Sequence, residues 1–383
     1  DQHYPLPPAL SPEGRGGRTL PSPSEGEGLG VRVNPLRAWV EALGELGNYY
    51  LNQYINGNRG VIQLLALEEA NLRAARRAAR RHGWWGRPVI GAMQGLRTLY
   101  EYQGRTAEWA RLVAEIVPDY CTASDDPIPG REEGYSLVME YRVYLARQVE
   151  RDLPRAAALQ GKLVAWNQQR AAAALALPSD ASLDAAQRNQ IRTLAVSLET
   201  LGHILREQGS PDCVAHYQEA SGYYQRIGDA AAEAITHYNL GRAYDEVPAI
   251  RDLDAAEAAY RRSLELHDPD DALGRARCIQ QIGMVHHQRF NEARGREESD
   301  AALRHARAAE EHYQQALALC PPSAVADLGP IHGQLGNLYA EVGQIERARE
   351  HYEQDVQICE QTGDRYGAGQ TRFNLALMYS RAA

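Results

Sequence analysis

Apolar residues recur at three- and four-residue spacings along most of the chain, the repeat that gathers them on one face of an α-helix. From Asn34 onward β-branched runs are rare, and the strong helix formers Ala, Leu, Arg, Glu and Gln dominate. The pattern breaks at clusters of Gly, Pro, Asp and Ser, at residues 124–130, 177–184 and 320–322. It predicts an all-α chain of successive helices joined by turns.

The first part of the chain lacks this pattern. Six of the 19 Pro and six of the 33 Gly fall within the first 30 positions. Proline fixes φ and removes an amide donor, and glycine raises backbone entropy, so neither helix nor sheet is favoured. We predict that residues 1–34 are a disordered Pro/Gly-rich leader or linker.

A motif repeats within the helical part. A Leu-Gly pair, or Ile-Gly once, occurs at 201–202, 240–241, 282–283 and 335–336. After each pair, a small residue precedes a tyrosine by four positions, as in Cys213/Tyr217, Ala256/Tyr260, Ala309/Tyr313 and Ala348/Tyr352. A Gly-Asp-x9-Asn-Leu motif occurs at 228–240 and again at 363–375. The pattern predicts antiparallel helix pairs in which small residues allow close approach and tyrosines fill the junctions.

These motifs resemble the tetratricopeptide repeat (TPR), a pair of helices that stacks on the next pair. The resemblance implies a right-handed superhelical solenoid of antiparallel helix pairs, about seven in all. It is clear over residues 186–383, where the last repeat is incomplete, and divergent over residues 35–185. There, Leu46-Gly47 with Tyr50 predicts a first helix A, and Trp109 replaces a small residue. The charged stretch 288–307 predicts an elongated, solvated helix B with a loop before it.

The repeat also explains an unusual composition of 21 Tyr against 2 Phe. Nine tyrosines occupy the aromatic positions of helix A or helix B, namely Tyr50, Tyr100, Tyr217, Tyr244, Tyr260, Tyr313, Tyr339, Tyr352 and Tyr379. Such positions favour a bulky ring with a polar tip. The tyrosine excess therefore predicts helix stacking and not an active site.

Charge and cysteine content narrow the function classes. The formal net charge of −9 argues against nucleic-acid binding by the whole surface. The lone lysine, Lys162, is followed by Leu163, which excludes a Walker A phosphate loop. The five cysteines form no C-x-x-C pair, as expected for reduced thiols in a cytoplasmic protein. No apolar run is long enough to span a membrane, and no cofactor is predicted.

Catalytic motifs are missing from the sequence, so we predict no enzyme. His286 and His287 are adjacent, and Cys213 lies near His203 and His216. The alternatives are metal binding for the histidine pair and a nucleophile for Cys213. The repeat register places these residues at packing positions, which favours structural roles.

A basic stripe lies between Glu69 and Glu101. It consists of Arg73, Arg76, Arg77, Arg80 and Arg81 at helical spacing, followed by Arg87. One interpretation is a solvated helix face, and the other is a docking patch for an acidic partner or nucleic acid. Trp84 and Trp85 are expected to be core residues at a helix end, with base stacking as the alternative.

The concave face of a TPR array is lined by helices A. The register then predicts a partner-binding groove formed by Glu199, His203, Arg206, Tyr238, Asn239, Arg242, Asp245, Arg277, Gln280, Met284, His287, Asn337 and Glu341. Asn239 and Arg277 match part of the carboxylate clamp of chaperone-tail-binding TPR proteins. Glu199 and His203 stand where that clamp has Lys and Asn, and an anionic Glu would repel a carboxylate.

The chain also resembles the helical sensor regions of bacterial signalling proteins that accompany STAND-type nucleotide-binding modules or caspase-like CHAT proteases. This resemblance implies a non-catalytic scaffold or sensor whose partner is another protein or a peptide, such as a protease or a STAND-type effector. The alternatives are a receptor for a short peptide, of the quorum-sensing type, and a regulatory subunit that contacts nucleic acid through the arginine stripe.

Overall fold

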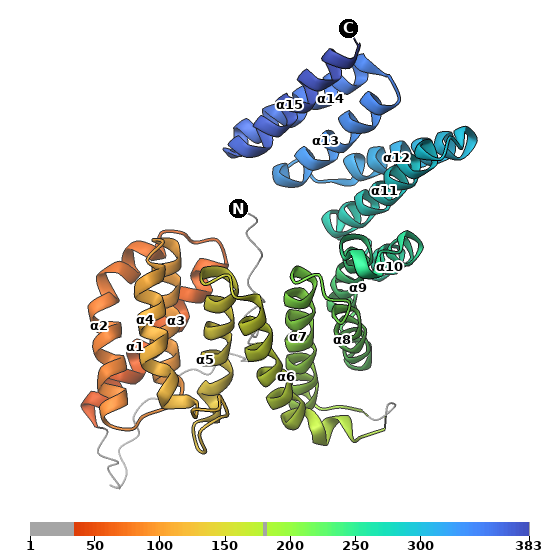
Figure 1. Ribbon diagram of the computed structural model, residues 1–383. Coiled ribbons are helices and arrows are strands. Elements are labelled where there is room, and N and C mark those ends of the chain that lie inside the picture. Colours follow the sequence, from red (N-terminus) through yellow and green to blue (C-terminus); the bar gives the residue numbers. More distant parts are fainter. Residues whose placement is uncertain (1–33, 179–181, 383) are drawn as a thin grey trace. The chain divides into compact units, whose positions relative to one another are not determined.

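The computed structural model describes residues 34–178 and 182–382 of the chain (Figure 1). Its regular structure within these ranges is helical, apart from one isolated antiparallel bridge between Cys121 and Pro127. The predicted all-α class, with antiparallel helix pairs arranged as a solenoid, is confirmed. The predicted disordered segment lies outside the described residues except for Asn34. That residue lies directly before the first helix and caps it, because its side chain accepts hydrogen bonds from the amides of Leu36 and Arg37.

The chain divides into two compact units after Arg151. The N-terminal unit contains α1 (Pro35–Ile55), α2 (Val61–Arg81), α3 (Arg87–Tyr102), α4 (Thr106–Tyr120), α5 (Glu132–Tyr144) and the π-helical turn η1 (Leu145–Val149). The helix α6 (Leu153–Leu175) packs on α7 (Ala185–Glu207) and so belongs to the C-terminal unit. The predicted division at residue 185, between divergent and clear repeats, stays a prediction.

The C-terminal unit continues as helix pairs. They are α7 (Ala185–Glu207) with α8 (Cys213–Ile227), α9 (Ala230–Glu246) with α10 (Leu253–Leu266), α11 (Ala272–Gly295) with α12 (Ser299–Leu319), and α13 (Val325–Glu341) with α14 (Ile345–Thr362). A short 3-10 turn, η2 (Pro248–Ile250), lies in the connection between α9 and α10. α15 (Arg365–Ala382) follows and packs on α14. Because each pair packs on the next, no pair has to bury its apolar faces alone.

The turns use the residues that the sequence motifs mark. Gly228 and Gly363 end α8 and α14 with positive φ, a conformation that glycine adopts without steric cost. Asp229 then accepts a hydrogen bond from the amide of Ala232 at the start of α9. Asp152 and Asp252 cap α6 and α10 in the same way. These aspartates satisfy amides that a helix leaves unpaired in its first turn.

The same contact closes each pair of the C-terminal unit. A tyrosine ring from helix B lies over a glycine of helix A, in the pairs Tyr217/Gly202, Tyr260/Gly241, Tyr313/Gly283 and Tyr352/Gly336. A Cβ placed on any of these glycines would come within 2.6 to 2.8 Å of the ring. The four tyrosines are 0 to 3% exposed, which confirms the packing role predicted for the helix B tyrosines.

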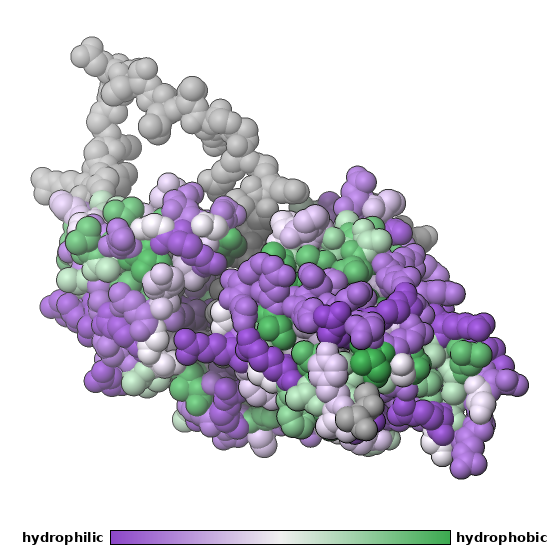
Figure 2. Space-filling view, turned by 90° about the horizontal axis from the view of Figure 1, so that it is seen from above, coloured by the Kyte–Doolittle hydropathy of each residue, from purple (hydrophilic) through white to green (hydrophobic). Residues whose placement is uncertain are grey.

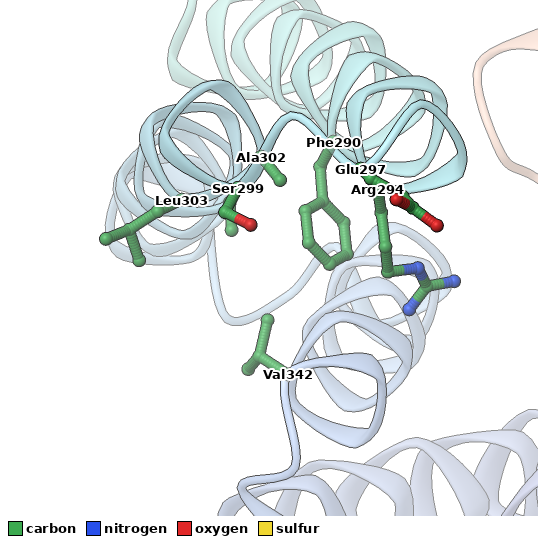
Figure 3. A pocket seen from close by; sticks show the side chains of 8 residues that line it. Phe290, Arg294, Glu297, Ser299, Ala302, Leu303 and Val342 are labelled. Atoms are coloured by element: carbon green, nitrogen blue, oxygen red, sulfur yellow. The ribbon is translucent and has the colours of Figure 1, made fainter.

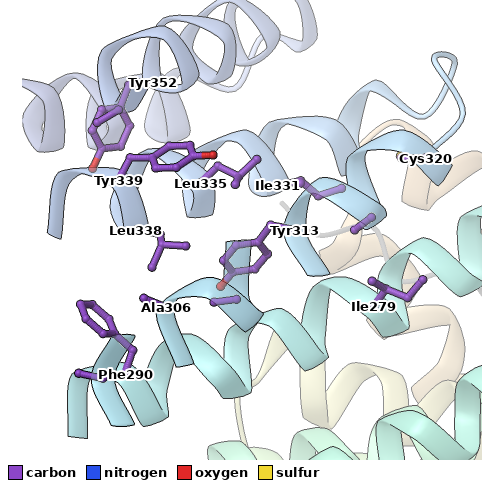
Figure 4. Packing of buried hydrophobic residues seen from close by; sticks show 14 of the residues in the cluster. Ile279, Phe290, Ala306, Tyr313, Cys320, Ile331, Leu335, Leu338, Tyr339 and Tyr352 are labelled. Atoms are coloured by element: carbon purple, nitrogen blue, oxygen red, sulfur yellow. The ribbon is translucent and has the colours of Figure 1, made fainter. Parts of the chain in front are cut away.

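One extended core cluster runs across α11 to α15 (Figure 4). Tyr313, Leu335 and Tyr352 are buried within it, together with alanines that let the helix axes approach. Phe290 lies at one end of this cluster, under the tip of the α11–α12 pair. The cluster joins consecutive pairs, so this part of the unit has a continuous apolar interior.

The N-terminal unit has one ring contact of this kind, between Tyr120 and Gly134, but it also uses glycines in another way. Gly47, predicted to belong to a first helix A, lies in α1. A Cβ on Gly47 would overlap the carbonyl oxygen of Gly91 in α3, and a Cβ on Gly91 would overlap that of Gly44. Backbone therefore lies against backbone between α1 and α3, with no tyrosine between them. Trp109 is buried and meets Tyr141 of α5 edge to face, with ring centroids 4.8 Å apart.

The elongated helix B predicted for the stretch 288–307 is confirmed in α12, but the first residues of the stretch belong to helix A and not to a loop or to helix B. Helix A of this repeat, α11, continues to Gly295, and α12 begins at Ser299. Both helices of the pair are elongated, and three residues connect them. The charged residues of this stretch continue both helices, because Glu, Arg and Ala have high helix propensity and only Gly295 interrupts them.

Candidate functional site

The α11–α12 pair is longer than the pair before it. α11 has 24 residues against 17 in α9, and α12 has 21 against 14 in α10. Seven additional residues at about 1.5 Å each lengthen each helix by about 10 Å. The connecting turn places Glu297 at φ 61°, a left-handed conformation that is uncommon for residues other than glycine.

An apolar notch lies beside this extended tip (Figure 3). We define the notch by Phe290 and Arg294 of α11, Ala302, Leu303 and Ala306 of α12, and Val342 after α13, with Glu297 and Ser299 at its edge. Phe290 and the two alanines are buried, whereas Leu303 is 51% and Val342 is 38% exposed. The notch thus has a buried apolar floor and two exposed apolar walls.

The size and edge of the notch limit what it can hold. Its volume is about 290 Å³, at the lower end of the range usual for pockets that enclose a drug-sized ligand. The guanidinium of Arg294 lies 5.2 Å from the centre of the Phe290 ring, within range of a cation–π contact. An apolar side chain of a protein partner fits this combination of an open apolar hollow and a polar edge.

The predicted groove residues form a polar ladder between successive helices A. Asn239 Nδ2 on α9 donates to Glu199 Oε1 on α7 at 3.0 Å, and Arg206 of α7 pairs with Glu246 of α9. Between α9 and α11, Gln281 Nε2 donates to the Tyr238 hydroxyl at 3.2 Å. Each rung joins one repeat to the next.

The ladder continues toward the C-terminus. Arg277 of α11 pairs with Asp327 of α13 at 2.6 Å, and His287 Nε2 lies 3.0 Å from Glu341 Oε2. Asn374 Nδ2 of α15 donates to Asn337 Oδ1 of α13 at 3.3 Å. A peptide that used these groups would have to replace bonds that already exist, and a buried polar group left without a partner is costly.

The remaining groove candidates also have internal contacts. His203 Nδ1 lies 2.9 Å from the Tyr217 hydroxyl, and Arg242 pairs with Glu246. Gln280 is buried, Met284 packs against the core cluster, and burial raises the pKa of Asp245. Their role in partner binding stays a prediction, and the structure gives them a visible role within the chain.

Two ladder carboxyl groups have shifted pKa values of opposite sign. Burial raises the pKa of Glu199 to about 7, although hydrogen bonds from Asn239 and Tyr224 favour its charged form. Burial acts in the same direction on Glu341, but there the hydrogen bond and charge of His287 prevail and hold its pKa below the usual value. Protonated Glu199 would not repel the carboxylate of a ligand. Asn239, the residue expected to hold that carboxylate, is however already hydrogen-bonded to Glu199.

The arginine stripe is partly internal. Arg76 is 4% exposed and pairs with Glu115 of α4, which contradicts its predicted place on a solvated face. Arg80 pairs with Asp119 of α4 at 3.0 Å, and Arg73 lies 3.7 Å from Glu69. The physical reason is that the fold places α4 beside α2. Two acids of α4, each 39 residues further along the chain, therefore reach arginines of the stripe.

The rest of the stripe is exposed. Arg77, Arg81 and Arg87 face solvent. Trp84 and Trp85 are half-buried, with Trp84 stacked on His82 and Trp85 edge-on to Tyr120. Arg131 also lies 4.0 Å from the centre of the Trp85 ring. Because internal contacts occupy these rings and half of the arginines, the patch offers less to nucleic acid than its sequence indicates.

The other candidate chemistry is buried. All five cysteines are buried thiols, and burial raises the pKa of Cys213, which disfavours the reactive thiolate. His286 Nδ1 lies 3.3 Å from His305 Nδ1, and burial lowers the pKa of His286 to about 4. Among residues 34–178 and 182–382, no three His, Cys, Asp or Glu side chains are placed to hold a metal ion. In the same ranges no helix has the length and apolar content to cross a membrane.

Comparisons with known proteins add little. No protein-family model matches the chain, and no curated protein matches it. One similar solved structure is described as "Structure of Naa15/Naa10 bound to HypK-THB". It shares 14% identity at a TM-score of 0.21, over 92% of this chain and 59% of that one. A similarity at that TM-score carries no argument about function.

The notch was not predicted from sequence. Its wall residues Leu303 and Val342 lie outside the repeat motifs, and both line the notch because the extended α11–α12 pair lies beside the end of α13. One signal pointed there: Phe290 is one of two phenylalanines in a chain that otherwise uses tyrosine. A ring without a hydroxyl suits a site where no polar partner is available.

Proposed function

We propose that this chain is a non-catalytic scaffold that binds another protein, and that the notch receives an apolar side chain of that partner. The observation that carries the proposal is the pair of exposed walls, Leu303 and Val342, beside the buried ring of Phe290. Covering exposed apolar surface is favourable by about 25 cal/mol per Å². Apolar anchors that fill preformed pockets dominate many protein interfaces.

The geometry supports a scaffold over a small-molecule receptor. The notch is open and small, and the polar groups of the helix A ladder are bonded to one another. A short peptide that inserted one apolar side chain would use the same notch, so a peptide receptor is a variant of this proposal. It would show saturable binding of a short peptide that competes with the protein partner.

The proposed cellular setting is a bacterial signalling or defence system in the cytoplasm, with a protease or a STAND-type effector as partner. It is supported by the sequence resemblance to sensor regions of such systems and by five buried thiols. Co-purification with an effector encoded beside this chain would support it. Hydrolytic activity of the chain that is lost on changing His286 or His287 would contradict the whole proposal.

The notch is tested with matched variants of the full chain. Leu303→Asp and Val342→Asp place a charge on each wall, and Ile235→Asp changes a residue of α9 that is 52% exposed and outside the notch. Partners captured by tagged chain are identified by mass spectrometry, and the complex is rebuilt from purified components. We expect each wall variant to weaken binding at least about tenfold and the control to have little effect. Equal binding by all variants would exclude the notch.

A further inference from the structure

The hydroxyl groups of the helix B tyrosines differ in their surroundings. Three of them have a polar partner on helix A, at 2.9, 3.3 and 2.8 Å in the pairs Tyr217/His203, Tyr313/His287 and Tyr352/Asn337. The hydroxyl of Tyr260 is buried and has no hydrogen-bond partner among the residues that the structure describes. A buried polar group without a partner costs free energy, so native proteins contain few of them. Tyr260 therefore marks a place where a group from outside the chain can supply the hydrogen bond.

A second buried atom without a partner lies on the same helix pair. Asp245 of α9 is half-buried, and its Oδ1 has no hydrogen-bond partner within residues 34–178 and 182–382. The two groups lie near each other, since burial raises the pKa of Tyr260 and the charges of Tyr238 and Asp245 raise it further. The face shown in Figure 2 is mostly hydrophilic, so exposed charges alone do not single out a site. Two neighbouring buried polar atoms without partners do single one out.

The repeat register shows what the other helix pairs place here. The residue four positions after the helix A glycine is Arg206 in α7, Asp245 in α9 and His287 in α11. The residue five positions after the glycine of the next helix A is Glu246, Gln288 or Glu341, in the same order. Arg206 pairs with its glutamate, and His287 lies 3.0 Å from Glu341. The middle rung of the ladder therefore has an acid where the rungs on either side have a basic side chain.

The charges around the middle rung favour a cation. Burial raises the pKa of Asp245, while the side chain of Gln288 favours its charged form. Arg242 and Arg251 also act on Asp245, but each is already paired with a glutamate. A carboxylate accepts hydrogen bonds and cannot donate them, so its unpartnered oxygen requires a donor. An anion is disfavoured, because it would face the charges of Asp245 and the neighbouring Glu246.

The two unpartnered atoms suit an ammonium group better than a guanidinium. Asp245 Oδ1 and the Tyr260 hydroxyl oxygen are acceptors from different helices, and both are buried. An ammonium is a compact charge with three donors, whereas a guanidinium is a planar fork that suits both oxygens of one carboxylate. The terminal torsion of an aspartate is soft, so its carboxylate can rotate and present the buried oxygen on the half-exposed side of Asp245.

We propose that Asp245 and the Tyr260 hydroxyl form a cation site on the helix A face, which binds the ammonium group of a lysine of the partner protein. This inference rests on the proposed scaffold function and adds a polar anchor to the apolar notch. The lysine takes the place that Arg206 and His287 hold in the neighbouring rungs. The site shares no residue with the notch, so either can fail while the other stands.

The free site is tested with n-butylammonium chloride, which carries the end of a lysine side chain. Thermal unfolding of the full chain is compared in about 50 mM of this salt and in sodium chloride at the same concentration. We expect butylammonium to raise the Tm of the wild type by about 1 to 3 °C relative to sodium. Asp245→Asn should remove this gain, and Glu265→Gln should keep it, since Glu265 is exposed on α10. No gain in the wild type, or an equal gain in Asp245→Asn, would overturn the proposal.

Two tyrosine hydroxyl groups give a matched comparison in the free chain. Tyr313→Phe removes a hydroxyl that has His287 as its partner, and it should lower the Tm by about 2 to 4 °C. Tyr260→Phe keeps the ring and removes the unpartnered hydroxyl, so the Tm should stay unchanged or rise. It should also reduce the butylammonium gain to less than about half. Equal losses of Tm in the two variants would show that Tyr260 already has a partner and would contradict the proposal.

A double variant copies a neighbouring rung into the middle pair. Asp245→His with Gln288→Glu reproduces the combination of His287 and Glu341, so it should abolish the butylammonium gain without lowering the Tm. With the purified partner, Asp245→Asn and the double variant should each weaken binding at least about tenfold. Unchanged partner binding by Asp245→Asn would overturn the lysine contact and leave the scaffold function intact. If no partner is captured, the scaffold function fails, and the butylammonium comparison still decides on the cation site.

Discussion

The two units of the chain join their helices by different means. In the N-terminal unit, α1 and α3 meet at bare backbone around Gly91, and arginine–carboxylate pairs such as Arg105 with Glu69 link the helices. In the C-terminal unit, tyrosine rings lie over glycines, and groups with shifted pKa values such as Glu199 and His286 lie between helices beside arginine–carboxylate pairs such as Arg206 with Glu246. The difference indicates that the glycine of a Leu-Gly-x-x-Tyr motif predicts a close contact with a neighbouring helix. It does not predict whether a tyrosine ring or a backbone carbonyl makes that contact. It also places Glu199, whose pKa burial raises to about 7, in the C-terminal unit.

The largest expected effect comes from filling the backbone contact. Gly91→Val should destabilise the N-terminal unit by about 3 kcal/mol or more, because the added atoms meet the backbone of Gly44, which cannot rotate away. Urea unfolding measures the loss, and hydrogen exchange in α1 and α3 locates it. Gly161→Ala in α6 is the control, since its Cβ would meet nothing within 4 Å. A smaller loss of unfolding free energy for Gly91→Val than for substitution of a glycine that faces a tyrosine would contradict the difference between the two units.

The next effect is a pH dependence in the C-terminal unit. The pKa of Glu199 is raised by burial to about 7, so its contribution to stability is fully present below about pH 4.5 and is lost as pH rises through 7. Glu199→Gln should remove this loss, which amounts to about 2 to 3 kcal/mol between pH 5 and 8. Denaturant titrations at several pH values measure it.

The control for that titration is Glu265→Gln, which changes a carboxylate of α10 that is 66% exposed. It should leave the pH profile of wild type unchanged. A profile of Glu199→Gln that matches wild type would show that Glu199 is ionised in the folded chain.

A smaller effect is expected where a glycine faces a ring. Gly241→Ala should cost about 1 to 2 kcal/mol, because Tyr260 can move away from the new methyl group. Adding Tyr260→Leu should recover part of the loss, since the smaller side chain leaves room for that methyl group. The free energies of unfolding of both single variants and the double variant form a double-mutant cycle. Simple additivity would contradict a direct contact, and Gly222→Ala in α8 is the control because its Cβ meets nothing within 4 Å.

The smallest effect concerns the ion pairs of the N-terminal unit. Arg105 pairs with Glu69 at 2.7 Å and with Glu108 at 2.6 Å, and the hydrogen bond from Arg105 lowers the pKa of Glu69. The Arg105 side chain is 28% exposed, so Arg105→Gln should cost only about 0.5 to 1 kcal/mol. The cost should shrink at 1 M salt, as thermal unfolding at low and high salt would show. A cost that does not change with salt would point to lost packing on Tyr100.

The sequence predicted which helix face most of the polar groove residues occupy, but not which residues they contact. The helix A register placed Glu199, Asn239, His287 and Glu341 on related faces of successive helices, and the structure joins them in pairs. The pairing itself depends on distances across helices some 40 to 54 residues apart in sequence, which a periodic pattern does not contain. The basic stripe shows the same limit, because Glu115 comes from another helix.

The sequence by itself determined the helices, their caps and the order of the repeats, because apolar spacing, Asp caps and left-handed glycines act within a few residues. It also determined that Tyr217, Tyr260, Tyr313 and Tyr352 pack in the C-terminal unit, but it marked Tyr379, which is 45% exposed, and did not mark Tyr224, which is buried. Only the tertiary structure decided that Gly47 meets the backbone of Gly91, that Arg76 is buried, and that Phe290 lies at the floor of the notch. Those outcomes depend on which helices pack against one another and which helix faces stay uncovered. Packing across the whole unit decides this, and a local sequence pattern does not contain it.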